Sequence, residues 1–180
     1  MACRRRLKSS IEIALVLVIE KGSVTLLLMG KDVIPVKIRG ILPANSGWAI
    51  FLGTEEKVFV IQVEHSIGAV IGMFLRETEK ERPLTHDLMA DIFAGFGIGV
   101  ERIVITELRN STYFARMILQ QQNELGRKVL EVDARPSDCI AMATAQKKPM
   151  YVDAGLFNDV EDMSEVLQQI NDANTESDDD

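Results

Sequence analysis

The order of the apolar segments along the chain limits the fold more than any other feature. Three stretches rich in β-branched and aromatic residues, at 33–41, 48–52 and 58–63, follow one another with only short turn segments between them. Helical periodicity begins only afterwards, at 66–76. Because runs of strands are interrupted by helices without a steady strand–helix–strand repeat, the pattern predicts an α+β fold on a mixed or antiparallel sheet with three to four helices.

The middle of the chain is expected to continue this pattern. Pro83 introduces a second helix, with Thr85 as its N-cap and Asp87 near the positive end of its dipole. Pro136 suits the first turn of a further helix, which should run to about residue 146. Strands are predicted at 100–108, 112–119, 128–133 and 149–152.

The two ends of the chain are expected to extend a domain that covers residues 33–160. In the N-terminal extension, residues 1–32, two apolar runs around a Glu-Lys-Gly-Ser segment predict a hairpin. The alternative is that translation starts at Met29. In the C-terminal segment, residues 161–180, an amphipathic helix at 161–170 is expected to precede a disordered acidic tail. The apolar stripe of that helix would comprise Met163, Val166, Leu167 and Ile170.

Charge and cysteine content narrow the classes of protein. Twenty Lys and Arg against 27 Asp and Glu give a net charge of −7, which disfavours a protein that coats nucleic acid. A nuclease is not excluded, because a divalent cation or a local Arg cluster can offset the repulsion of phosphate. The two cysteines form no CxxC motif, and no apolar run approaches the ~20 residues of a membrane span. We therefore expect a soluble, cytoplasmic protein with no membrane partner.

The segment Glu131-Val-Asp133-Ala-Arg135-Pro-Ser-Asp138 carries the most informative chemistry. Asp133 ends a predicted strand, Asp138 lies in the first turn of the next helix, and Arg135 stands between them. Carboxylates suit Mg²⁺ or Mn²⁺, and Arg suits phosphate, so the set fits a metal-assisted nuclease with Asp133 and Asp138 as ligands. The competing interpretation is structural: Asp138 stabilises its helix N-terminus, and Asp133 pairs with Arg135.

Other polar residues are candidate companions of that segment. His86 could act as a base near neutral pH, or serve as a local hydrogen-bonding residue. Asp87 and Asp91 fall at i and i+4 on one helix, where a cation could offset their repulsion. Cys139, beside apolar residues, is expected to be a small buried hydrophobe and not a nucleophile.

A third group of candidates lies on the predicted strands. By period-two alternation Ile105, Glu107 and Arg109 should share a face, with Arg116 on the neighbouring strand. The two arginines could hold phosphate, or pair with Glu107 across strands. Three aromatic residues, Trp48, Tyr113 and Phe114, could stack on bases, although core or interface packing is the more ordinary role.

Four motifs, in this order and spacing, resemble the bifunctional nuclease family, which has many bacterial members. They are Pro83-Leu-Thr-His-Asp-Leu88, Val104-Ile-Thr-Glu-Leu108, Tyr113-Phe-Ala115 and Glu131-Val-Asp-Ala-Arg-Pro-Ser-Asp-Cys-Ile-Ala141. The resemblance covers roughly residues 33–153 and implies an α+β domain with DNase and RNase activity. Between residues 58 and 67 the chain departs from the family pattern of Pro-Ile-x-Ile-Gly followed by Glu-Ala. Glu64 or His65 is the candidate substitute there.

The sequence therefore predicts a hydrolase that cleaves phosphodiester bonds of DNA and RNA with limited sequence preference. In this hypothesis His86 or Asp87 assists proton transfer, and Arg135, Arg109 and Arg116 contact phosphate. DNA and RNA would be transient substrates, and we expect a homo-oligomer. The alternative is a non-catalytic module that oligomerises and binds a partner or small ligand, with the charged motif as scaffold.

Overall fold

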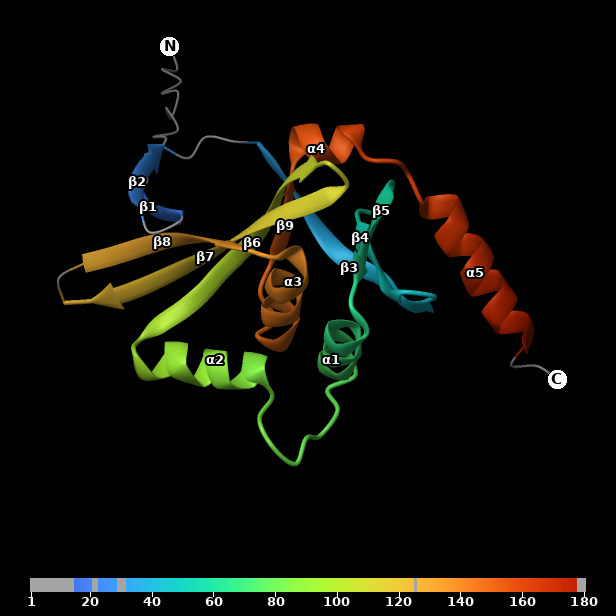
Figure 1. Ribbon diagram of the computed structural model, residues 1–180, viewed down its shortest axis with the longest axis horizontal. Coiled ribbons are helices and arrows are strands. Elements are labelled where there is room, and N and C mark those ends of the chain that lie inside the picture. The colour runs from blue at the N-terminus through green and yellow to red at the C-terminus, as the bar shows by residue number, and fades with distance from the viewer. Residues whose placement is uncertain (1–14, 21–22, 29–31, 125, 178–180) are drawn as a thin grey trace, which may run out of the picture.

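The protein is described by a computed structural model in which residues 15–20, 23–28, 32–124 and 126–177 can be placed. Nine strands of this part of the chain form one mixed sheet in the order β2-β1-β8-β7-β6-β9-β3-β4-β5 (Figure 1). The strands are β1 (Leu15–Glu20), β2 (Ser23–Leu28), β3 (Val33–Ala44), β4 (Gly47–Gly53), β5 (Val58–Val63), β6 (Ile98–Arg109), β7 (Thr112–Asn123), β8 (Gly126–Ala134) and β9 (Met150–Asp153). The helices are α1 (His65–Leu75), α2 (Thr85–Gly95), α3 (Pro136–Ala145), α4 (Ala154–Asp159) and α5 (Ser164–Ser177). The predicted α+β class is confirmed.

A meander of three long antiparallel strands, β6, β7 and β8, forms the centre of the sheet. The β6–β7 turn places Asn110 at φ 50° and Ser111 at φ 59°, the left-handed values that a tight hairpin turn requires and that Asn tolerates well. Beside the meander, β9 runs parallel to β6 and antiparallel to β3. The C-terminal ends of β8 and β9 each lead directly into a helix.

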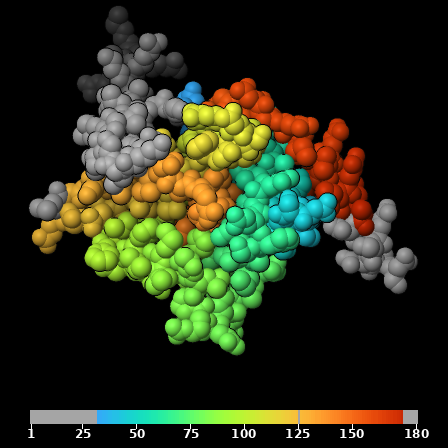
Figure 2. Space-filling view, viewed as in Figure 1, coloured from blue at the N-terminus to red at the C-terminus, as the bar shows by residue number. Residues whose placement is uncertain are grey.

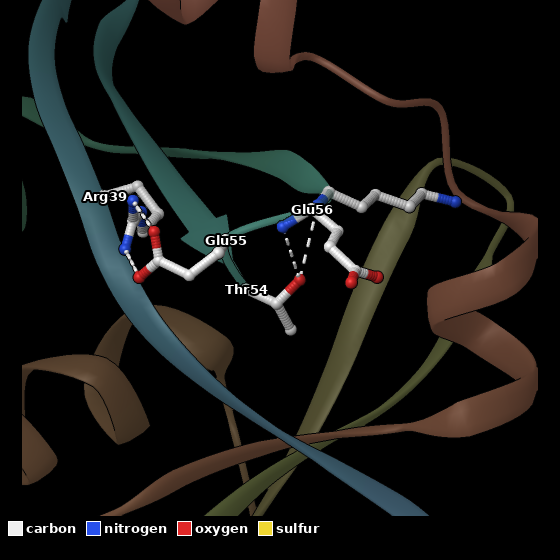
Figure 3. A network of polar contacts seen from close by, with 5 residues as sticks. Arg39, Thr54, Glu55 and Glu56 are labelled. Atoms are coloured by element: carbon white, nitrogen blue, oxygen red, sulfur yellow. Dashed lines mark hydrogen bonds and ion pairs between the residues drawn. The ribbon is translucent and has the colours of Figure 1, made fainter.

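The other part of the sheet is the β3–β4–β5 meander. Its β4–β5 turn is held by Thr54, whose Oγ1 accepts hydrogen bonds from the backbone amides of Glu56 and Lys57 at 3.2 and 3.3 Å (Figure 3). In the same turn Glu55 forms two hydrogen bonds with the guanidinium of Arg39 on β3, at 2.6 and 2.8 Å. These contacts hold the β4–β5 turn against β3.

Strands β1 and β2 form the hairpin that the N-terminal apolar runs predicted, with Glu20 opposite Ser23. Strand β1 also pairs in parallel with β8, from Leu17 opposite Leu130 to Ile19 opposite Val132. The beginning of the first apolar run, residues 11–14, and Met29 lie outside the described residues. The extension is thus joined to the same sheet as the meander.

Helices α1, α2 and α3 lie together on one face of the sheet (Figure 1). The main core lies between them and the strands, and it includes Ile50, Phe59, Ile103 and Ile140. Helix α1 comes so close to β4 that a Cβ on Gly68 would lie 2.2 Å from the Trp48 ring. A glycine is therefore required there. Trp48 packs against the core, as its ordinary role suggested.

The ends of the predicted helices shift by small amounts, for local reasons. Pro136 stands in the first turn of α3, as predicted. The N-cap of α2 is Leu84 and not Thr85, because the side chain of Asp87 accepts the Leu84 backbone amide at 2.8 Å and closes the first turn from inside the helix. The prediction of Thr85 as the cap was wrong by one residue.

Two helices near the C-terminus differ from the sequence prediction. Helix α4 was not predicted; the Asp153 carboxylate caps it by accepting the amides of Gly155 and Leu156 at 3.0 and 3.2 Å. Helix α5 runs from Ser164 to Ser177 and not over the predicted residues 161–170, so that it begins three residues later and residues 171–177 of the expected tail are helical. No glycine or proline interrupts this segment, although its residues are polar.

Helix α5 covers the face of β4 and β5 that is turned away from the main core. Leu167 packs against Phe51 and Val58 in a second, smaller cluster, joined by Met163 and Ile170. Val166, the fourth member of the expected stripe, is 40% exposed, because the contact surface of the strands reaches only one side of the helix. No described helix is long and apolar enough to cross a membrane.

Candidate functional site

A pocket of about 780 Å³ lies between the three helices, the middle of β7 and the C-terminal end of β8. It is lined by residues of α1, α2 and α3, of the segments before α2 and α3, and of both strands. They are Ser66, Ile67, Val70, Leu84, Thr85, His86, Met89, Phe93, Met117, Leu119, Val132, Asp133, Ala134, Arg135 and Asp138. Of the residues singled out in the sequence, the pocket brings together His86, Asp133, Arg135 and Asp138. We call this cavity the histidine pocket.

His86 is the second residue of α2 and is only 5% exposed. Its ring stands edge-on to Phe74 of α1, at 6.3 Å between ring centroids. Its Nε2 atom lies 3.6 Å from Oδ1 of Asp138. This geometry places the imidazole next to a carboxylate at the start of α3.

Asp138 also holds Arg135. The guanidinium donates from Nε to Oδ2 at 2.8 Å and from Nη2 to Oδ1 at 3.3 Å. This hydrogen bond and the negative charge of Asp138 raise the pKa of Arg135 above its ordinary value. The Arg135 side chain is 63% exposed, so one edge of the guanidinium is fixed by Asp138 while the group remains open to solvent. Asp138 therefore connects the buried histidine to an exposed cation.

Arg135 pairs with Asp138 in the structure. The structural interpretation of the sequence had paired it with Asp133 instead. Asp133 is exposed at the end of β8 and borders the histidine pocket. It lies opposite Arg116 in the β7–β8 register, so its side chain is directed to the outer face and away from Asp138. Its charge and that of Asp138 still reach Cys139: burial first, then these two carboxylates, raise the pKa of that thiol to about 12. Cys139 is fully buried in the core, which confirms that it is a packing residue.

The suspected Mg²⁺ or Mn²⁺ site needs several ligand side chains close to Asp133 and Asp138. Among the residues that the structure describes, no three His, Cys, Asp or Glu side chains come close enough together to hold a metal ion. Both oxygens of Asp138 already accept from Arg135. Two carboxylates fit an ion such as Mg²⁺ only where water and substrate phosphate complete its shell.

Asp87 follows His86 in sequence but does not line the histidine pocket. Both of its oxygens accept from Nζ of Lys80 at 2.7 Å, and Oδ2 also accepts the Leu84 amide. Burial opposes the ionisation of Asp87, but Lys80 and the Leu84 amide outweigh it and lower its pKa. Lys80 also lies 4.3 Å from the centre of the Phe74 ring. The positive charge of Lys80 beside Asp87 offsets the repulsion predicted between Asp87 and Asp91. Asp91 itself is exposed to solvent.

The prediction that Ile105 and Glu107 share a face was wrong. A β-bulge lies between them: Ile105 is opposite Ala115, whereas Glu107 is opposite Phe114. Because successive residues of β7 point to opposite faces, the bulge turns Glu107 to the face away from the helices. The extra residue, Thr106, reverses the in–out alternation of side chains along β6. A threonine at this position gives no signal of a bulge in the sequence.

The remaining arginines also lie away from the histidine pocket. Arg109 forms an ion pair with Glu107 and lies 5.7 Å from the Phe114 ring on the outer face. Arg116 contacts Glu131, which is 4% exposed, at 3.1 Å. Neither arginine is among the residues that line the pocket. Both arginines thus form ion pairs on the sheet, as their ordinary role suggested, but only the Arg116 pair crosses strands, and its partner is Glu131 and not Glu107.

The part of the chain that carries the histidine pocket has recognisable relatives. The family model of the bifunctional nuclease domain matches residues 50–164. The chain belongs to this family. The resemblance seen in the four motifs is therefore confirmed, and His86, Arg135 and Asp138 all lie within the matched segment.

Two relatives of this bifunctional nuclease domain are proteins of Mycobacterium tuberculosis, from strains CDC 1551 / Oshkosh and H37Rv. Each is 30% identical over 102 residues, which cover 57% of this chain and 58% of the relative. The match thus spans less than two thirds of either relative. Both relatives are described as uncharacterized, so they supply no activity, substrate or partner.

The segment 58–67, in which the chain departs from the family pattern, lies beside a second, smaller cavity. Glu64 is the N-cap residue of α1 and His65 its first residue; both are exposed. Glu64 lines this second pocket, of about 490 Å³, together with Arg135. His65 lines neither of the two pockets. Of the two candidate substitutes, Glu64 therefore borders one of these two pockets and His65 borders neither.

Some residues that line the histidine pocket were not predicted from the sequence. Met89 and Phe93 follow His86 at i+3 and i+7 on α2 and line the same cavity. This helical spacing was available in the sequence and indicates that His86 lies on the buried face of its helix. Ser66 of α1 gave no such signal, because one serine at a helix start is ordinary.

Proposed function

We propose that this bifunctional nuclease domain hydrolyses phosphodiester bonds of DNA and RNA at the histidine pocket, with limited sequence preference. The observation that carries the proposal is the sequence of contacts from His86 to Asp138 to Arg135 along one wall of that pocket. It combines an imidazole, the side chain that most often serves as a general base, with a cation suited to phosphate. The family to which the chain belongs is named for this activity.

Each of the three residues has a distinct part in the proposed reaction. His86 accepts a proton from the attacking water or hydroxyl, which general-base catalysis requires. Asp138 positions the imidazole and stabilises the imidazolium that forms. Arg135, exposed and held by Asp138, stabilises negative charge on the phosphate oxygens as it develops. Asp138 is a positioning residue in this scheme, because it acts through the other two.

A divalent cation remains part of the proposal. Asp133 and Asp138 are the suspected ligands of Mg²⁺ or Mn²⁺, with water and a phosphate oxygen completing the shell. Because Asp133 lies opposite Arg116 on the outer side of β8, its side chain would have to turn toward Asp138 for the two to share an ion. Such an ion would supply further positive charge to the phosphate. The scheme for His86 and Arg135 does not depend on it, so its contribution can be measured separately.

The test compares cleavage of single- and double-stranded DNA and RNA in Mg²⁺, Mn²⁺ or EDTA. We expect the purified full chain to cleave, and Arg135→Ala to lose most of the turnover. Arg39→Ala is the matched control, because Arg39 also forms two hydrogen bonds with a carboxylate, that of Glu55, but in the β4–β5 turn (Figure 3). Cleavage that tracks contaminating activity through purification, or that persists in a folded Asp133→Asn, Asp138→Asn double variant, would contradict the proposed site.

A non-catalytic, self-associating module is the second candidate function. Three exposed apolar residues, Leu88, Ile92 and Phe96, recur every fourth residue along α2 and its C-cap, and Phe96 is 71% exposed. Exposed apolar stripes of this kind commonly mark protein contacts. Sedimentation of the wild-type chain and of Phe96→Ser tests this. A monomeric wild-type chain that cleaves nucleic acid would reject the second candidate.

A further inference from the structure

The second pocket lies directly beside the histidine pocket. It is bounded by the edge strand β5, the start of α1, the β6–β7 turn and the start of α3. In Figure 2 the β6–β7 turn, in yellow, lies against the orange segment that contains α3 and the teal segment that contains β5. Ile67 and Arg135 line both cavities. A phosphate held at Arg135 would thus have one cavity on either side of it.

The charges of the second pocket do not suit a second phosphate. Its lining includes one cation, Arg135, at the border with the histidine pocket, and one carboxylate, Glu64. Glu64 acts on Arg135 electrostatically, so the two charges partly cancel. The other lining residues are uncharged: Val60, Ile61, Gln62, Val63, Ile67, Ser111, Thr112, Tyr113, Pro136 and Ser137. Such a lining favours a neutral ring with polar edges over an anion.

Tyr113 supplies an anchored aromatic surface in this lining. It stands near the start of β7, and its ring packs against Phe59 of the core at 6.0 Å between centroids, with the planes inclined by 41°. The side chain is half-buried, and burial raises the pKa of its phenol, so the hydroxyl stays neutral at physiological pH. The ring is therefore held in place by the core while part of it faces the pocket.

We propose that the second pocket binds one unpaired nucleobase of the substrate, with Tyr113 as the stacking residue. This inference rests on the proposed nuclease function, since it places the base next to the phosphate held at Arg135. Aromatic stacking accepts any base, which agrees with limited sequence preference. Gln62, Ser111 and Ser137 offer donors and acceptors for the edges of the base.

The proposal has a consequence for the substrate. A base inside a duplex is stacked and paired, so it reaches a concave pocket beside the phosphate only after it leaves the helix. Single strands, loops and ends present unstacked bases without that cost. The full chain should therefore bind a short single-stranded oligonucleotide more tightly than the duplex of the same sequence.

The test measures binding of a fluorescent single-stranded DNA oligonucleotide in EDTA, with its integrity checked on a gel afterwards. Tyr113→Leu should weaken binding between about 5-fold and about 150-fold, the range expected for loss of one stacked base. Tyr113→Phe keeps the ring and should bind within about twofold of wild type. Thermal melting of both variants identifies any loss of the Phe59 contact.

An oligonucleotide with abasic sites separates stacking from a structural role. If Tyr113 stacks on a base, removal of the bases weakens binding by the wild-type chain, and Tyr113→Leu has little further effect. If Tyr113 only supports the fold, Tyr113→Leu weakens binding of both oligonucleotides equally, and the proposal is overturned. Equal binding of duplex and single strand by the wild-type chain overturns it as well.

The two proposals can fail separately. Absence of cleavage, with the abasic and Tyr113→Leu effects intact, would contradict the nuclease and leave the base pocket. Cleavage that depends on Arg135 but is unchanged in Tyr113→Leu, together with equal binding of abasic DNA, would contradict the base pocket and leave the nuclease.

Discussion

On the helix-covered face of the sheet, Asp138 contacts both His86 and Arg135 beside a cavity of about 780 Å³. On the opposite face, Glu107 pairs with Arg109 and Glu131 with Arg116, along neighbouring strands. The residue types are nearly the same. The first group meets at this cavity because three helices converge there, whereas the second group lines neither of the two described pockets. Location relative to a cavity, and not charge alone, distinguishes a candidate site from sheet scaffolding.

The largest expected effect concerns the helix-covered face. His86→Ala should lower turnover by about 10²- to 10⁴-fold, the usual contribution of a general base, with folding checked by circular dichroism. His65→Ala is the matched histidine control, since His65 is exposed at the start of α1 and lines neither pocket. Full turnover by a folded His86→Ala would remove the histidine from the mechanism and abolish the contrast between the two faces.

The next effect concerns stability on the opposite face. Arg116→Ala removes the cation that contacts the buried Glu131, and leaving one member of a buried pair costs about 3 to 5 kcal/mol. Urea unfolding measures this loss, and Arg116→Lys, which keeps the charge, should lose less. A large fall in turnover per folded molecule, without loss of stability, would instead place Arg116 among the phosphate-binding residues.

A smaller effect should appear as a pH dependence of the free energy of unfolding. The pKa of Asp87 is lowered in the folded chain. Its contribution to the free energy of unfolding is therefore present above the ordinary carboxyl pKa of about 3.9 and is lost as the pH falls through the pKa of the folded state. Asp87→Asn should be less stable near neutral pH and should lose less on acidification than wild type. Parallel pH curves for the two proteins would show that the Lys80 contact does not stabilise the fold.

The smallest effect is expected for the exposed pair on the outer face. Glu107→Ala should change the free energy of unfolding by less than about 1 kcal/mol, because both side chains are largely open to solvent. Turnover should stay close to wild type, since the bulge turns Glu107 away from the histidine pocket. A strong loss of turnover would show that the outer face takes part in substrate binding.

The predicted elements agree with the structure wherever local pattern decides them. Strands at 33–41 and 58–63 and the helix opened by Pro136 follow from side-chain alternation and a fixed φ, which act over a few residues. Helix α4 escaped prediction because it has only six residues and its cap, Asp153, was placed next to a strand end. Short helices carry too few periodic positions for a pattern to appear.

The candidate site was predicted in part. The segment from Asp133 to Asp138 could be chosen from residue chemistry, and both aspartates border the histidine pocket. The sequence could not show which other candidate residues lie at the same site. His86 lines the histidine pocket, whereas Glu107 does not. The β-bulge in β6 and the packing of α2 against α3 decide this, and both depend on contacts between segments far apart in the chain.

The sequence by itself determined the α+β class, most of the elements and the family, because periodicity, turn chemistry and ordered motifs are local properties. Tertiary structure alone decided which charged residues meet. His86 comes within 3.6 Å of Asp138 only because α2 and α3 pack on the same face of the sheet, and Arg135 separates two cavities only because the β6–β7 turn reaches α3. Long-range packing sets these distances, and no short stretch of sequence encodes them.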